Sequence, residues 1–290
     1  MTEKRSIARA SRPSAAARFP PRRILAATDL GPSSAAALRA VKIWAALFGA
    51  EVTVLHAQHF DAPAYFTSEQ TRTLAREMKA ARARAAAALA GDAAKILGAP
   101  PRALVVEKPP VDAVLSAAQD WDADLIALGT HGRRGAARLW LGSVAEGVLR
   151  RSDRPVLAVG PAAETKPMRR ILCPVGEGAT GAAALAYAAA LARALDAKLL
   201  LLHAAGKKPD AADCPWDRTE LGRLCEIEEI GVAADPADAV LRAARDRRAD
   251  LVVMGARRSQ SAFGPLFSST TERVMRLLGA PLLVIPGPEA

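Results

Sequence analysis

Short runs of apolar residues without polar interruptions alternate along this chain with longer, alanine-rich segments whose apolar positions recur at helical spacing. Such uninterrupted runs are typical of strands buried on both faces, as in parallel sheets covered by helices. In the first 160 residues they predict strands at 24–27, 52–55, 104–106, 125–128 and 156–159. The intervening segments predict helices near 34–48, 68–97, 111–121 and 143–150. This alternation predicts an α/β fold built on a doubly wound open sheet of about five parallel strands.

The pattern occurs twice along the chain. The stretch RILAATD, which ends at Asp29, corresponds to RILCPVG, which ends 147 residues later at Gly176. Further along, ADLIALG ends at Gly129 and corresponds to ADLVVMG, which ends 126 residues later at Gly255. Because a fixed offset indicates an internal repeat, we infer two tandem domains of the same fold. The offset falls by 21 residues between the two comparisons, so we expect a shortened middle in the second copy, with a truncated second helix.

We place a basic tail at 1–21, a first domain at 22–162 and a second domain at 167–288. Prolines and small residues around 160–167 are typical of a linker. The chain carries a net charge of +10, and residues 1–23 hold seven basic side chains against one acidic side chain. Phe19 is the single aromatic residue of this tail, so the tail lacks the aromatic side chains on which nucleic-acid bases stack. We therefore do not expect nucleic-acid binding.

Composition also argues against several other classes of protein. No apolar run reaches the roughly eighteen residues of a membrane span, since Arg193 interrupts the longest alanine-rich stretch, so we expect no membrane partner. The three cysteines lack CxxC spacing and the four histidines are scattered, which predicts neither a disulfide framework nor a zinc site. Together these features predict a cytoplasmic protein.

The segment after the predicted strand 125–128 has the residues expected of an anion site. Its glycines are Gly129, Gly132 and Gly142, with Ser143 opening the next helix, a spacing of Gly-x2-Gly-x9-Gly-Ser. Glycines let backbone amides approach an anion, and a helix start offers unpaired amides with a positive dipole end. In open α/β sheets, ligands bind beyond the carboxyl ends of the strands, which is where this segment begins. The pattern predicts phosphate binding; the arginines within it either add to the site or are solvated.

This motif resembles the nucleotide motif of the ATP-binding branch of the universal stress protein family. The likeness extends over about 22–288 and includes the strand end Thr28-Asp29, the strand end Leu-His56 and the closing PVLAV strand. The resemblance implies an adenine nucleotide, ATP with or without Mg²⁺, as the ligand. It also implies that the two halves pair through their last strands as an intramolecular pseudo-dimer, which leaves homodimerisation open.

For the nucleoside, the resemblance implies that Asp29 contacts the ribose or a metal-bound phosphate, with Thr28 beside it. The backbone of Ala57 would meet the adenine edge, and Gly129 would line the ribose. An alternative for Asp29 is a purely local role in the turn before the first helix. An alternative for His56 is that of a core histidine at a strand end.

For the phosphates, the resemblance implies that Gly142, Ser143 and Val144 wrap around them and that Gly132 lines their path. His131 lies in the same loop, where it could orient a phosphate or a water molecule. Ser143 also has an alternative, because Ser143-x-x-Glu146 fits a capping box.

The second copy differs at the positions that would face the ligand. Gly132 corresponds to Arg258, Gly142 to Ser268 and Asp29 to Gly176, whereas Ser269 with Glu272 keeps the capping-box spacing. A long guanidinium in the phosphate path predicts a degenerate site in the second half. The alternative is that Arg258 and its neighbour Arg257 serve another anionic ligand.

Catalytic signatures do not accompany the glycine motif. The chain has no P-loop lysine motif, no kinase-type catalytic loop and no Gly-x-Ser-x-Gly elbow. We therefore expect an ATP-binding stress or signalling module with little or no turnover, in which occupancy orders the loop that contains the glycines. The alternative function is a stress-related scaffold that binds no nucleotide and uses the tandem fold to present surfaces.

Overall fold

The fold is that of a computed structural model, which describes residues 18–58, 68–130, 142–161, 163, 167–176, 178–203, 221–223, 225–232, 234–256 and 269–287. Side chains of 68–79 and of Ser269 are outside this description. The strands of the first half are β1 (Arg23–Ala27), β2 (Glu51–Gln58), β3 (Arg102–Glu107), β4 (Leu125–Gly129) and β5 (Val156–Val159). The helices of this half are α1 (Pro32–Phe48), α2 (Ser68–Leu97), α3 (Pro110–Asp120) and α4 (Ser143–Arg151). Each predicted element of the first half is present within a few residues of its expected bounds.

The second half repeats this arrangement. Its strands are β6 (Arg170–Pro174), β7 (Lys198–His203), β8 (Ile227–Gly231), β9 (Leu251–Ala256) and β10 (Leu282–Pro286). Its described helices are α5 (Gly178–Leu195), α7 (Pro236–Asp246) and α8 (Ser269–Leu277). Most of the segment between β7 and β8, where we expect the truncated helix, lies outside the described residues.

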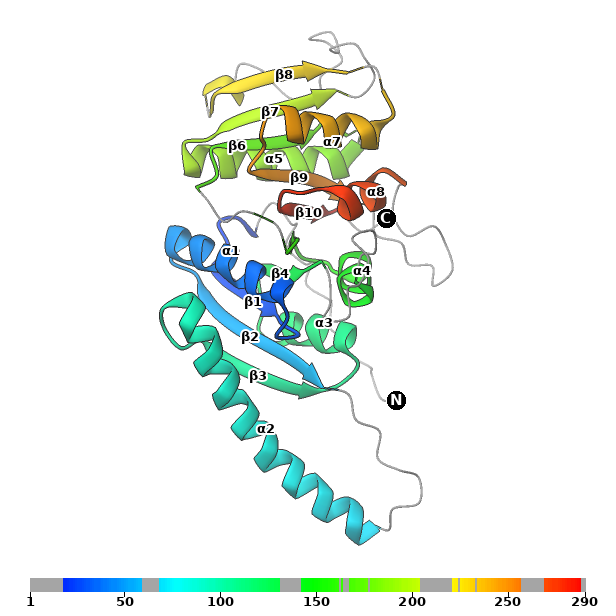
Figure 1. The fold of residues 1–290 in the computed structure, drawn as a ribbon. Helices are drawn as coiled ribbons and strands as arrows, with labels where there is room; N and C mark the ends of the chain where they lie inside the picture. Colours follow the sequence, from blue (N-terminus) through cyan, green and yellow to red (C-terminus); the bar gives the residue numbers. More distant parts are fainter. Residues whose placement is uncertain are drawn as a thin grey trace, which may run out of the picture.

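All ten strands form one sheet in the order β3-β2-β1-β4-β5-β10-β9-β6-β7-β8 (Figure 1). Pairing is parallel within each half, and β5 pairs with β10 in antiparallel fashion, with Leu157 opposite Leu283. The two last strands, which taken singly would be edges, are thus the centre of the sheet. The α/β class with parallel, doubly wound halves is confirmed.

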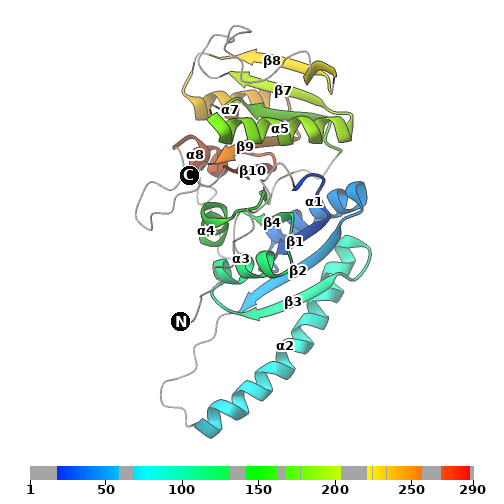
Figure 2. The ribbon, with the colours of Figure 1, turned by 180° about the vertical axis from the view of Figure 1, so that it is seen from behind.

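Helices cover both faces of the sheet (Figures 1 and 2). One face packs against α1, α2 and α5, and the other packs against α3, α4, α7 and α8. By length and hydropathy α5 could cross a membrane, in spite of Arg193, but its buried side chains, Tyr187 and Leu191 among them, pack onto the sheet as those of a core helix do.

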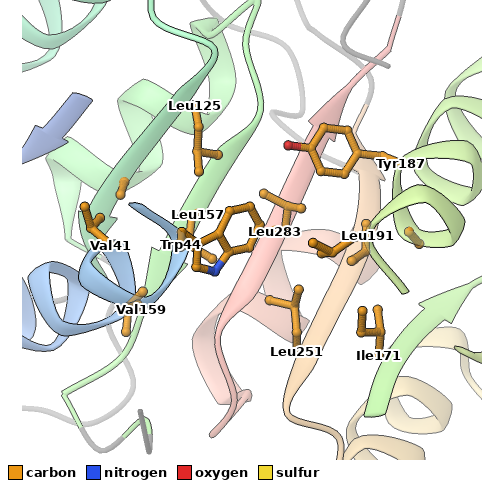
Figure 3. Packing of buried hydrophobic residues seen from close by; sticks show 14 of the residues in the cluster. Val41, Trp44, Leu125, Leu157, Val159, Ile171, Tyr187, Leu191, Leu251 and Leu283 are labelled. Carbon is orange, nitrogen blue, oxygen red and sulfur yellow. The ribbon is translucent and has the colours of Figure 1, made fainter. Parts of the chain in front are cut away.

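The apolar core is continuous across the β5–β10 junction. Trp44 of α1 lies beside Leu157 and Leu283, and Tyr187 of α5 lies on the other side of Leu283 (Figure 3). The N-terminal segment also contributes to this core, since the ring of Phe19 is 5.5 Å from that of Phe48 and 5.1 Å from that of Tyr187. Residues of both halves therefore share one buried cluster.

Candidate functional site

A cleft opens in the first half where strand order reverses between β1 and β4, the position at which doubly wound sheets bind ligands. Its volume is about 190 Å³, and the space between its lining atoms is about 700 Å³ when the open mouth is included. The enclosed volume is smaller than the roughly 300–1,000 Å³ of a typical small-molecule site, so a ligand the size of a nucleotide would extend through the open mouth. The lining residues come from the ends of β1, β2 and β4 and from the starts of α1, α3 and α4: Ala27, Thr28, Asp29, Ser34, Leu55, His56, Ala57, Pro110, Val114, Leu128, Gly129, Gly142, Ser143, Val144 and Ala145.

The turn after β1 is held by side-chain hydrogen bonds. Asp29 Oδ1 accepts the Gly31 N–H at 2.9 Å and the Ser34 hydroxyl at 2.5 Å, and Ser34 Oγ accepts the Asp29 N–H at 3.1 Å. Thr28 Oγ1 accepts the N–H of Leu30 at 3.0 Å, which stabilises the left-handed conformation of Leu30 at φ 64°. The local role of Asp29 in this turn is therefore confirmed, and the turn places the carboxylate at the cleft wall.

Gly129 ends β4 directly beneath the start of α1. A Cβ atom at this position would lie 2.6 Å from Ser33 Cβ and 2.8 Å from the Ser34 nitrogen, which is too close for any other residue without movement. Gly255 occupies the same position in the second half, where a Cβ would lie 2.7 Å from the Thr180 carbonyl oxygen. Helix-to-strand packing alone thus explains why both copies have glycine here.

The start of α4 faces the cleft with its backbone. Gly142 is the N-cap residue, at φ −63° and ψ 138°, and as a glycine it has no side chain with which to cap the helix. Its N–H donates to the Thr130 carbonyl at 2.7 Å, and the Glu146 N–H donates to its carbonyl at 2.9 Å. The capping-box prediction for Ser143 is wrong, because Ser143 is already the first helical residue and its side chain is exposed. The first amides of a helix have no intrahelical acceptors, so those of Ser143, Val144 and Ala145 can serve a ligand in the cleft.

His56 joins the end of β2 to the turn after β1. Its Nδ1 lies 2.8 Å from the carbonyl oxygen of Thr28, and since a carbonyl can only accept, Nδ1 carries the proton. The ring is half-buried and lines the cleft. His56 thus lies at a strand end, as the alternative predicted, but its ring borders the cleft and is not in the core.

The structure gathers seven of the nine residues predicted for the site around this one cleft: Thr28, Asp29, Ala57, Gly129, Gly142, Ser143 and Val144. The other two, His131 and Gly132, lie outside the described residues. Sequence reasoning missed Ser34, Pro110, Val114 and Ala145, which come from helix starts. Ser34 could have been found from its five-residue distance to Asp29 at the start of a helix.

The equivalent turn of the second half is built differently. Gly176 and Gly181 replace Asp29 and Ser34, and their backbones approach so closely that a Cβ on Gly181 would lie 1.9 Å from the Gly176 carbonyl oxygen. Gly287, after β10, packs in the same way against the Thr180 side chain. Arg257, Arg258 and Ser268, which we expected to alter the second site, lie outside the described residues.

The family model described as "Universal stress protein family" matches residues 21–160 and 217–286, well over half of the chain. The chain belongs to the universal stress protein family. A universal stress protein from Archaeoglobus fulgidus DSM 4304 has the same fold, with a TM-score of 0.67 and 21% identity over 92% of this chain and 97% of that one. A putative universal stress protein from Pseudomonas aeruginosa UCBPP-PA14 gives a TM-score of 0.59 at 17% identity, over 92% of this chain and 94% of that one.

Two single-domain-sized relatives match one part of the chain. Universal stress protein MJ0577 of Methanocaldococcus jannaschii is 36% identical over 56 residues, which is 19% of this chain. The match spans about 35% of that curated relative's length. A universal stress protein solved in complex with cAMP is 30% identical, over 50% of this chain and 98% of that one, with a TM-score of 0.34.

Proposed function

We propose that this universal stress protein binds ATP in the cleft of its first half and acts through occupancy of that cleft with little or no turnover. The observation that carries the proposal is the convergence of the β1 turn, the end of β4 and the uncapped start of α4 on one cleft. Membership of a family in which a relative 30% identical to this chain has been solved in complex with cAMP supports it.

The cleft matches the two ends of an adenine nucleotide. Leu55, Val114 and Leu128 provide an apolar wall for the base, next to the backbone of Ala57. Gly142 and the first amides of α4 provide donors and a positive dipole end for phosphates, and the N-cap glycine itself has no side chain that would compete for them. Asp29 would then meet the ribose hydroxyls or a metal on the phosphates.

Any Mg²⁺ would depend on the nucleotide for most of its ligands. Among the described residues, no group of three or more His, Cys, Asp or Glu side chains is placed to hold a metal ion. Of the cleft-lining residues within the described part of the chain, Asp29 alone carries a carboxylate. Mg²⁺ is commonly held by one or two carboxylates together with substrate phosphates and water, and Asp29 fits that role.

The second half is proposed to lack an equivalent nucleotide site. The Asp29–Ser34 pair is replaced there by direct contact between the backbones of Gly176 and Gly181, neither of which carries a carboxylate for a ribose or metal. In this proposal the second half serves as the structural partner of the first.

Isothermal titration of the purified protein with ATP tests the proposal, with cAMP and ADP as competing ligands. The informative variant is Gly142→Asp. Aspartate is a favoured N-cap residue, so the helix keeps or gains stability, while its carboxylate repels phosphate at the same point. We expect ATP to bind at least about tenfold more weakly, equivalent to about 1.4 kcal/mol.

The matched control is Gly222→Asp, which adds the same charge at an exposed position where a Cβ meets nothing within 4 Å. It should leave the ATP affinity unchanged. Unaltered binding by Gly142→Asp would place the nucleotide elsewhere. Absence of heat with all three nucleotides, and of any nucleotide released by acid from the purified protein, would favour the scaffold function.

A further inference from the structure

A second hollow lies in the other half, where α7 and α8 end and β9 and β10 begin. Its volume is about 650 Å³. We call it the arginine groove, because Arg242, Arg245 and Arg248 lie along it, together with an apolar floor and rim. Its lining residues are Asp238, Leu241, Arg242, Ala244, Arg245, Arg248, Ala249, Asp250, Leu277, Leu278, Gly279, Ala280 and Pro281.

The acidic residues of the groove are already engaged. Asp238 Oδ1 accepts a hydrogen bond from Arg273 at 2.7 Å, and Asp250 Oδ2 accepts the backbone N–H groups of Arg169 and Arg170 at 2.9 Å. The three groove arginines are exposed to solvent. One of them, Arg245, pairs with its exposed neighbour Asp246. The positive charge that the groove offers to a ligand is therefore chiefly that of Arg242 and Arg248, since Arg245 has Asp246 as its partner.

The first half shows what fills the equivalent place there. Arg248 corresponds to Asp122 and Ala280 to Arg154. Arg154 donates to Asp122 at 3.1 Å and to the Ala123 carbonyl at 2.6 Å. Arg18, from the distant N-terminal segment, also donates to Asp122 at 3.1 Å and is 7% exposed. A charged side chain from another segment thus enters this place and meets a residue of opposite charge.

At the equivalent place in the second half the acidic residue is replaced by a basic one, and the arginine that fills the space in the first half is replaced by alanine. Arginine stands where the first half has Asp122, and Ala280 with Gly279 leaves open the space that Arg154 and Asp153 occupy in the first half. Leu277, at the rim, is a large hydrophobic residue that is 47% exposed. Carboxylates complement the arginines, and an apolar side chain would cover the leucine.

We propose that the arginine groove docks an acidic peptide segment of a partner protein, in which carboxylates flank an apolar side chain. This surface lies in the half that the proposed nucleotide site does not use, so neither proposal depends on the other. Arginine is the cation suited to such contacts, because its planar fork pairs with a carboxylate through two hydrogen bonds.

Fluorescence polarisation with a labelled twelve-residue peptide of alternating Glu and Leu tests the proposal on the full-length protein. A matched peptide with Gln in place of Glu provides the uncharged comparison. The double variant Arg242→Gln with Arg248→Asn removes two groove charges; asparagine is chosen at 248 because it tolerates the left-handed backbone found there, φ 51°. We expect at least about tenfold weaker binding of the acidic peptide, as for loss of interface arginines.

The control is Arg39→Gln with Arg193→Gln, which removes the same charge from exposed positions on α1 and α5, the opposite face of the sheet. It should change the dissociation constant by less than about twofold, as for charges outside an interface. Equal loss in both double variants would reduce the effect to net charge and overturn the proposal. So would equal binding of the Gln peptide, or displacement of the acidic peptide by millimolar inorganic phosphate, which would make the groove a site for small anions.

Discussion

The turns after β1 and β6 are both held against the start of the following helix, but by different contacts. In the first half, two polar side chains, Asp29 and Ser34, hold the turn to the start of α1. In the second half, Gly176 and Gly181 bring the two backbones into direct contact. The glycine at the end of the fourth strand is retained in both halves, because the helix packs onto it in either case. The comparison separates residues that the fold requires from residues that leave room for a ligand.

The largest effect should follow from giving the second half the residue of the first. Gly181→Ser puts a Cβ 1.9 Å from the Gly176 carbonyl, so the backbone must move. We expect a loss of about 3 kcal/mol or more in the free energy of unfolding, at the upper end of overpacking effects. Urea denaturation followed by circular dichroism measures it. Gly222→Ser, where a Cβ has open space, is the control; similar small losses in both variants would show that the turn opens readily.

A second difference between the halves is Cys173, which corresponds to Ala26 in the first half. Burial raises the pKa of the Cys173 thiol from 9.0 to about 12. The unfolded chain therefore releases this proton at lower pH than the folded chain, and stability falls as the pH rises above about 9. The expected slope is about 1.4 kcal/mol per pH unit.

Cys173→Ala should flatten this dependence between pH 8.5 and 10, at a cost of about 1 kcal/mol at neutral pH from the lost sulfur. Burial also raises the pKa of Tyr187, so both proteins should still lose stability at higher pH. Unfolding curves at half-unit pH steps measure the difference. Parallel pH profiles of the two proteins would contradict the assignment to Cys173.

The smallest effect concerns the polar pair of the first half. Ser34→Ala removes a buried hydroxyl that donates to Asp29 Oδ1 and accepts its N–H. We expect a loss of about 1 kcal/mol, the usual net worth of a buried hydrogen bond. The midpoint of thermal unfolding measures this loss. The corresponding change in the second half, Gly181→Ala, is not a suitable control, because a Cβ at that position collides with the Gly176 backbone. An unchanged midpoint would mean that α1 packing alone holds the turn.

Much of the fold was predictable because apolar runs between glycines and prolines set the strands independently of long-range contacts. The cleft was predictable where its residues lie at strand ends, as Asp29 and Gly129 do. Val114 and Pro110 were not, since a residue on a helix start faces the cleft only through the packing of α3 against the sheet.

Two further features depended on three-dimensional context. Ser143 has capping-box spacing, yet the chain enters α4 one residue earlier, at Gly142. Arg18 belongs to the segment that we placed in the basic tail, and it is buried against Asp122 and Asp124, more than a hundred residues away. Neither the helix entry point nor so distant a partner is encoded in local pattern.

The pairing of β5 with β10 gives the second half a structural role that does not depend on ligand binding. Without β10, the apolar strand β5 would be an open edge, and such edges invite aggregation. Pairing with β10 covers this edge, so the second half protects the first from such contacts and shares its buried core. Its opposite ends are then free to change in sequence and acquire other partners, while the shared strand stays under constraint.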